Sequence, residues 1–127
     1  LQKAVFQRLQ SDSQLMSIVK DIYDFVPEQT EYPYVVVGEQ TDRPFNTKDT
    51  IGENRTLVIH AYSQYNGKRE AYEISNLMLQ ALSKQPLELG DGFKIQDFSK
   101  EPGSTVIQDI DGKTYHAVLR LRYIINN

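Results

Sequence analysis

Histidines and paired carboxylates are the side chains of this chain that would support acid–base or metal chemistry. His60 and His116 each lie in the middle of a predicted strand, and neither has a catalytic or metal-ligating partner near it in sequence. A histidine that binds metal or catalyses a reaction needs such partners. We therefore interpret both as structural, while noting that the two rings would meet across the sheet if their strands were neighbours.

The other patterns with chemical potential also lack an essential part. Asp109 and Asp111 begin like a calcium-binding loop, but the twelfth position of that loop is Arg120, where a bidentate glutamate is required. Asp21 and Asp24 show no sign of differing environments, which an acid–base pair needs. Cysteine is absent, so thiol catalysis and thiolate metal sites are excluded. The sequence predicts no enzyme, no metal and no cofactor.

Composition is that of an ordinary globular domain. The 127 residues are enough for one hydrophobic core, and we expect a single domain over residues 1–127. Lysine and arginine number 14 against 17 aspartates and glutamates, a formal net charge of −3. This balance disfavours tight duplex binding through a general basic patch. No stretch approaches the roughly 20 apolar residues of a membrane span.

Two stretches have the apolar spacing of amphipathic helices. Leu1, Val5 and Leu9 recur every four residues, and a short second turn follows around residues 15–19. Residues 67–82 form the clearest helix, which Pro86 follows. The buried stripe predicted for this helix consists of Ala71, Ile74, Met78, Ala81 and Leu82.

Strand signals surround the long helix. The run of residues 34–37 predicts a central strand that is buried on both faces. Residues 56–63 and 113–125 alternate between apolar and polar positions, as strands with one face on a core do. Shorter strands are expected over residues 22–26, 93–98 and 105–110, with a tight turn at Asp111-Gly112 before the last strand. The predicted fold is α+β: a mainly antiparallel sheet with helices packed on one face.

The segment 40–54 is polar and interrupted by Pro44 and Gly52. Connections usually span about 4–6 residues. This one is therefore functional, disordered or an extended hairpin, and we favour the first two. Arg120 and Arg122, on the less apolar face of the last strand, are further candidates for contact with a partner. From the long segment, the predicted contact residues are Asp42, Arg43, Phe45, Asn46, Lys48 and Asp49.

The order of these elements resembles the small tail completion proteins, or tail-to-head joining proteins, of long-tailed phages and prophages. The resemblance is carried by the first helix, by the strand sequence Tyr-Pro-Tyr-Val-Val-Val-Gly at residues 32–38, by the helix at residues 67–82, and by residues 111–116 leading into residues 118–122. It covers nearly the whole chain and rests on order and spacing rather than on a catalytic signature.

That resemblance implies a tail-terminator-like fold and a non-enzymatic virion protein. Members of this family assemble as a hexameric ring at the end of the tail tube and dock to the connector or stopper protein of the head. The ring leaves a channel through which DNA passes without specific binding. By analogy, segment 40–54 would contact the tube protein or a neighbouring subunit. The location implied is the head–tail interface of the virion, after synthesis in the bacterial cytoplasm, with no membrane and no small-molecule substrate.

Two other readings stay open at this stage. A small ligand-binding or enzymatic domain would place His60, His116 and Tyr62 in a pocket between helix and sheet. A monomeric adaptor would instead offer a sheet edge to a partner peptide.

Overall fold

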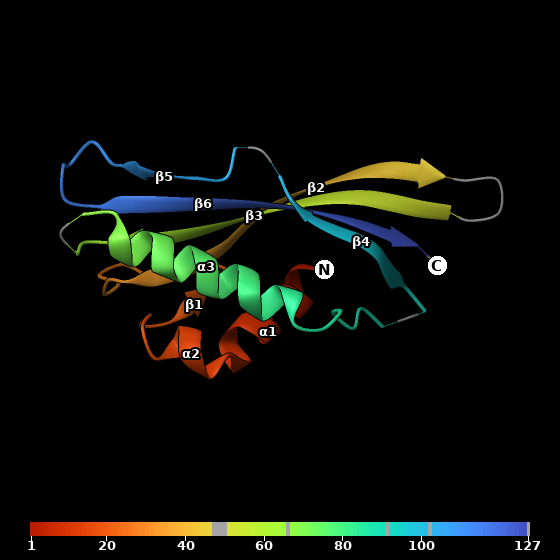
Figure 1. Ribbon diagram of the computed structural model, residues 1–127, viewed down its shortest axis with the longest axis horizontal. Coiled ribbons are helices and arrows are strands. Elements are labelled where there is room, and N and C mark those ends of the chain that lie inside the picture. The colour runs from red at the N-terminus through yellow and green to blue at the C-terminus, as the bar shows by residue number, and fades with distance from the viewer. Residues whose placement is uncertain (47–50, 66, 91, 102, 127) are drawn as a thin grey trace.

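Two layers make up the computed structural model, which describes residues 1–46, 51–65, 67–90, 92–101 and 103–126. A six-stranded sheet forms one layer, and three helices lie along one of its faces (Figure 1). The described elements are α1 (Gln2–Ser11), α2 (Ser13–Met16), β1 (Ile22–Tyr23), β2 (Tyr34–Asn46), β3 (Ile51–Ser63), α3 (Arg69–Ser83), β4 (Lys94–Lys100), β5 (Thr105–Gln108) and β6 (Tyr115–Asn126).

The sheet has the order β1-β2-β3-β6-β4, and β5 pairs with β6 on the same edge as β4. Only the two-residue pairing of β1 with β2 is parallel; the other four pairings are antiparallel. Strand β6 is long enough to pair β5 along its first residues and β4 along its last ones. The α+β fold with a mainly antiparallel sheet and helices on one face is thus confirmed.

Helix α3 contributes the centre of the core. The five residues of its predicted stripe are all buried, and they pack against the inner faces of β3 and β6. The inner positions of those strands alternate as predicted, with Leu57 and Ile59 on β3 and Leu119 and Leu121 on β6 completely buried. Burying each such side chain contributes about 1.5–3 kcal/mol, so this contact accounts for much of the stability of the fold.

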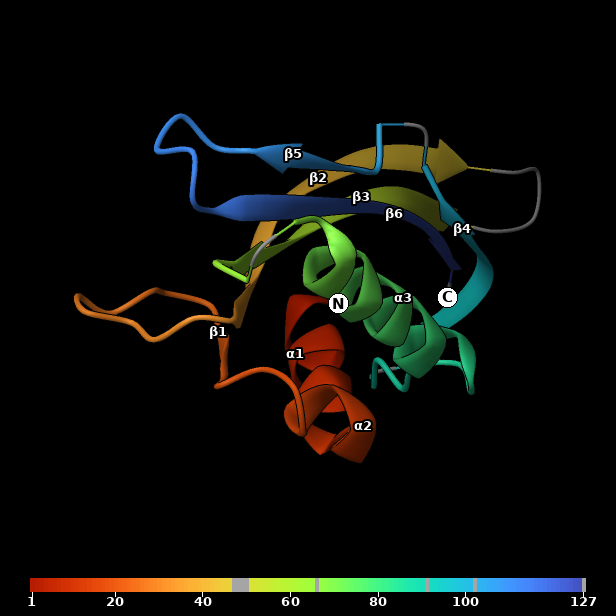
Figure 2. The same ribbon diagram turned by 60° about the vertical axis from the view of Figure 1, so that its left-hand side comes forward.

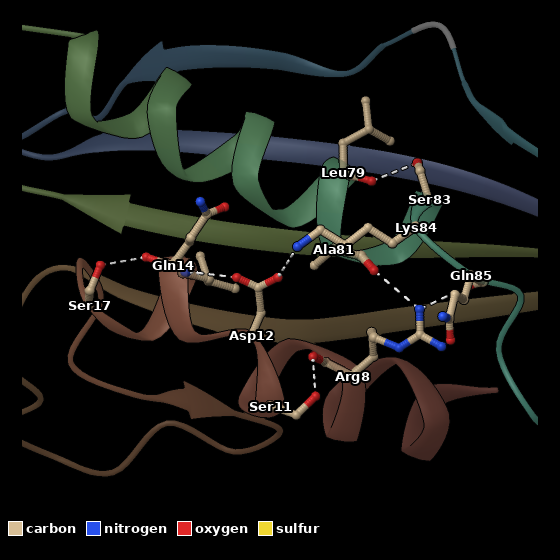
Figure 3. A network of polar contacts seen from close by, with 11 residues as sticks. Arg8, Ser11, Asp12, Gln14, Ser17, Leu79, Ala81, Ser83, Lys84 and Gln85 are labelled. Carbon is tan, nitrogen blue, oxygen red and sulfur yellow. Dashed lines mark hydrogen bonds and ion pairs between the residues drawn. The ribbon is translucent and has the colours of Figure 1, made fainter.

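Polar contacts fix α1 and α2 beside the end of α3 (Figure 3). The Arg8 guanidinium donates to the carbonyls of Ala81 and Gln85, at 3.2 and 2.9 Å, and so caps the C-terminus of α3. Asp12 accepts from the Leu15 amide at 2.9 Å and caps α2. The other Asp12 oxygen lies 3.5 Å from Nζ of Lys84. The two short helices are therefore oriented by α3 as well as by their apolar faces.

Segment 40–54 is strand over the residues that the structure describes, so the interpretation as a disordered loop was wrong there, while its contact with a partner stays a prediction. Residues up to Asn46 continue β2, and β3 begins at Ile51, which makes the third alternative, an extended hairpin, correct. The polar side chains of this segment suggested a loop. The segment is strand because backbone hydrogen bonds join β2 to β3 and β3 to β6, and such bonds need no apolar side chain. Pro44 is tolerated because β1 pairs only with Val35 and Val36, which leaves the outer edge of β2 unpaired further along the described strand.

Other boundaries differ by a few residues. Strand β1 stops at Tyr23 rather than residue 26, β5 stops at Gln108 rather than residue 110, and β4 and β6 are each shifted. Val36 is half-buried on the face that the helices leave uncovered, so the prediction that residues 34–37 are buried on both faces was wrong. Among the described residues, no helix has both the length and the apolar character needed to cross a membrane.

Candidate functional site

The face of the sheet that carries no helix presents the polar and aromatic side chains of β2, β3 and β6. We call it the open face. Strand residues alternate between faces, so the residues between the buried positions of β3 and β6 all lie here. The open face holds two distinct sets of side chains, one aromatic and one rich in arginine.

The first set, here called the aromatic row, consists of Tyr34, Tyr62, His60 and His116. Tyr34 stacks on Tyr62 with ring centroids 5.1 Å apart, and Tyr62 stacks on His116 at 4.3 Å. Tyr23 and Tyr32 extend the row beyond Tyr34, at 6.0 and 5.2 Å. The row runs across β2, β3 and β6 because Tyr34 lies opposite Tyr62, and Tyr62 opposite His116, in the strand register.

The two histidines of the aromatic row bond to each other. Nδ1 of His60 lies 2.7 Å from Nε2 of His116, so one ring donates and the other accepts. Burial, and then the charge of His60, lower the pKa of His116, while Asp109 and Glu39 act in the opposite direction. Two nitrogens that bind one zinc ion lie about 3.3 Å apart, at Zn–N distances of about 2.0–2.1 Å. The contact is therefore a hydrogen bond that stabilises the sheet, and the described residues contain no group of metal-ligating side chains.

The tyrosines of the aromatic row remain uncharged at neutral pH. Burial is the main cause that raises the pKa of Tyr34 to about 12, with Tyr32 and Tyr62 adding to it. The pKa of Tyr62 is raised by burial and by the carboxylates of Asp109 and Glu39. A neutral, stacked aromatic surface of this kind suits protein contact, since tyrosine combines a large apolar area with a polar tip.

The second set forms a cavity of about 340 Å³, here called the arginine cleft. It lies further along the open face, where β2 and β3 continue past the helices. Arg43, Arg120 and Arg122 give it a positive charge that Glu101 offsets only in part. Its lining residues are Thr41, Arg43, Asn54, Thr56, Glu101, Arg120 and Arg122.

Arg122 is incompletely paired inside this cleft. Its Nε lies 3.9 Å from Glu101, too far for a hydrogen bond, and this atom is buried without a hydrogen-bond partner among the described residues. The loop that carries Glu101 is fixed in place: the Glu101 amide donates to the Arg120 carbonyl at 2.8 Å, and the Arg120 amide donates to Oγ of Ser104 at 3.0 Å. The cleft is thus a preorganised cationic site that fits a carboxylate or a phosphate.

The structure brings together three of the residues predicted as partner contacts. Arg43, Arg120 and Arg122 come from two strands and line the same cleft. Asp42 points to the other side of β2, where it lies 3.5 Å from Nε of Arg55. Phe45 and Asn46 end β2, with side chains outside the description, and Lys48 and Asp49 lie outside the described residues.

Some surface features were not anticipated from the sequence. Phe25 is 82% exposed and Ile110 fully exposed, although both are large apolar residues. Phe25 lies between Asp24 and Val26-Pro27, and Ile110 directly precedes the Asp111-Gly112 turn, so their neighbours signalled loop positions. Glu101 gave no such signal, because only the pairing of β4 with β6 places it beside Arg122.

Comparison with known proteins gives consistent matches over the whole chain. The family described as tail completion protein gp17 matches residues 3–126. The tail completion protein gp17 of Bacillus phage SPP1 is 38% identical over 127 residues, which cover 100% of this chain and 92% of that protein.

Two solved structures share the fold. A solved structure of SPP1 gp17 has a TM-score of 0.72 at 37% identity, over 99% of this chain and 88% of that one. A chain of the native gene transfer agent virion has a TM-score of 0.88 at 22% identity, over 100% of this chain and 95% of that one.

Proposed function

The chain belongs to the tail completion protein gp17 family, and we propose that it is a structural virion subunit that joins the phage tail to the head. The observation that carries the proposal is the family match from residue 3 to residue 126, because it includes both the core and the open face. The SPP1 relative is similar over the full length of this chain.

In this proposal the subunits form a hexameric ring at the end of the tail tube. Two features of the chain support self-association. The outer edge of β2 is unpaired beyond Val36 in the described strand, and the open face carries stacked aromatics and a cationic cleft that no helix covers. A surface that meets a different surface on the next copy generates a ring when the rotation closes.

The ring would contact the tail tube protein on one side and the connector or stopper protein of the head on the other. The hairpin of β2 and β3 extends past the helices (Figure 1) and offers a contact element beyond the core. A formal net charge of −3 suits a channel through which DNA passes without specific binding, because like charge disfavours phosphate contact.

Catalysis by the histidines is not part of the proposal. His60 and His116 lie on the open face, so a pocket between helix and sheet would not contain them. Their nitrogens are engaged with each other at 2.7 Å, which favours the structural role predicted for both.

Deleting the coding sequence from the phage or prophage that carries it tests the proposal. We expect filled heads and completed tails that remain separate in electron micrographs, with joining restored when the purified chain is added to the lysate. A reconstruction of joined particles should contain six-fold density of this fold between tube and connector. Intact, infectious particles made without the chain would overturn the proposal.

A further inference from the structure

We propose that residues 24–31 of one copy dock in the arginine cleft of the next copy, with carboxylates on guanidinium groups. We call this segment the acidic loop. The inference rests on the proposed function, because it supplies the contact that links neighbouring subunits of the ring.

The acidic loop is negatively charged and free of cations. It contains Asp24, Glu28 and Glu31 and no lysine or arginine. All three carboxylates are exposed, and none forms an ion pair with any residue that the structure describes. Phe25 extends from the same loop with 82% of its surface exposed. Aromatic residues are enriched on surfaces that bind a partner.

The arginine cleft carries the opposite charge, and its guanidinium groups are incompletely paired. Arg43 and Arg120 form no ion pair within the described part of the chain, and the buried Nε of Arg122 lacks an acceptor. A buried donor without a partner is destabilising, so a carboxylate that reached it would stabilise the complex. Guanidinium groups bind carboxylates in a bidentate manner and also stack on aromatic rings. The acidic loop supplies both kinds of group.

A chain cannot make this contact with itself. Tyr34 and Arg43 are nine positions apart on β2, which corresponds to about 25–30 Å along the strand. The acidic loop leaves the sheet beside Tyr34, and five extended residues reach at most about 18 Å from the point of departure. Figure 2 shows this loop extending in the opposite direction from the far end of the β2–β3 hairpin. An acidic loop that docks in this cleft therefore belongs to another copy.

Loop and cleft at opposite ends of the subunit give a head-to-tail contact. Such a heterologous contact uses two different patches on each copy and builds a ring when its rotation closes. Loop and cleft could also pair reciprocally across a two-fold axis, and cross-linking of such a contact would end at a dimer. A closed species of higher order is therefore the result expected of a ring.

Disulfide trapping tests the contact directly, because the chain contains no cysteine of its own. Thr30→Cys places a thiol in the acidic loop, and Thr41→Cys places one at the cleft. Neither substitution changes a charge. In the double variant at high protein concentration and low salt, oxidation should give a ladder of covalent oligomers ending in a closed species. The matched control pairs Thr30→Cys with Ser83→Cys, which lies at the end of α3.

We expect the loop–cleft pair to cross-link about tenfold faster than the control pair, because docking raises the effective concentration of the two thiols. Cross-linking should slow as salt is added, since exposed charges are screened. Equal rates for the two pairs would overturn the proposal.

Charge reversal distinguishes the proposed contact from other acidic partners of the cleft. Arg43→Glu with Arg120→Glu, or Glu28→Arg with Glu31→Arg, should each lower the cross-linking rate of the loop–cleft pair about tenfold. Combining all four reversals restores opposite charge between the exchanged positions, while Arg122 and Asp24 keep their charges, and should restore most of the rate. Failure of this restoration in a folded variant overturns the proposal. An effect of the cleft reversals without any effect of the loop reversals also overturns it, and would instead indicate another acidic ligand such as the DNA backbone.

The same variants separate this inference from the proposed function. If deletion of the chain prevents joining while both charge-reversed variants join heads to tails normally, the function stands and the loop–cleft contact is wrong. If deletion leaves joined particles, the proposed function is wrong, whatever the cross-linking shows.

Discussion

Nδ1 of His60 lies 2.7 Å from Nε2 of His116, although the two residues are 56 positions apart in the chain. The contact arises because β3 and β6 are neighbours and Tyr62, two residues after His60, lies opposite His116. Tyr62 stacks on the His116 ring at 4.3 Å and covers part of it from water. The pair therefore joins the two central strands on the open face, in a position where its protonation affects the sheet.

We expect the fold to lose stability on acidification from pH 7.5 to pH 5.5. Burial lowers the pKa of His116 in the folded state, so between this pKa and the ordinary value of about 6.5 the unfolded state binds more protons. The stabilisation is complete above pH 6.5 and is lost as the pH falls toward the folded pKa. Urea denaturation midpoints measured across this range would show the decrease.

The control for this prediction is His116→Phe, in which an aromatic ring still stacks on Tyr62 but cannot bind a proton. Its stability should change less between pH 7.5 and 5.5 than that of the wild type. An equal decrease in the two proteins would assign the pH dependence to groups other than His116.

Gly38→Ala should destabilise the protein by about 1–3 kcal/mol. A Cβ atom at this position would lie 2.8 Å from the Val58 carbonyl oxygen and 2.9 Å from Cδ2 of His60. The ring has some freedom to move, but the carbonyl belongs to β3 and is fixed by pairing. Thermal or urea denaturation measures the change.

Gly112→Asn is the control for Gly38→Ala. The backbone of Gly112 has φ = 72°, which asparagine tolerates, and nothing lies within 4 Å of a Cβ added to Gly112. We expect a smaller loss than for Gly38→Ala. A Gly38→Ala protein as stable as wild type would show that β2 and β3 can separate at this point without cost.

Arg8→Met should lower the free energy of unfolding by about 1–3 kcal/mol. Methionine keeps the apolar stem but removes donors to the carbonyls of Ala81, Gln85 and Pro86. Arg8→Lys should recover only part of the loss, because one ammonium group cannot span the carbonyls that the guanidinium fork reaches. Equal stability of the Lys variant and the wild type would contradict a role for the fork.

Tyr123→Phe should leave the stability unchanged or increase it by up to about 1 kcal/mol. The side chain is 1% exposed, and its hydroxyl has no hydrogen-bond partner among the described residues. Removing the hydroxyl ends this desolvation cost while the ring keeps its contact with Phe98, at a centroid distance of 4.8 Å. A loss above about 1 kcal/mol would indicate a partner for the hydroxyl, such as a buried water molecule. Tyr123→Ala, by contrast, should cost about 3–5 kcal/mol.

Local periodicity was sufficient to predict which residues form the core. The stripe of α3 from Ala71 to Leu82 and the alternation on β6 were correct, because each depends on residues within one helix or one strand. A turn does precede β6, but residues 109–114 separate the paired positions of β5 and β6, and of Asp111 and Gly112 only Gly112 has a positive φ. The same reasoning failed at segment 40–54, where polar side chains conceal a hairpin that is held by pairing with other strands.

The sequence by itself determined the fold class, the buried faces and the family resemblance, since these follow from spacing along the chain. Only the tertiary structure decided that His60 meets His116, and that Arg43, Arg120 and Arg122 line one cleft with Glu101. The physical reason is that strand order and register place residues from distant segments side by side. Neither is encoded in the periodicity of a single element.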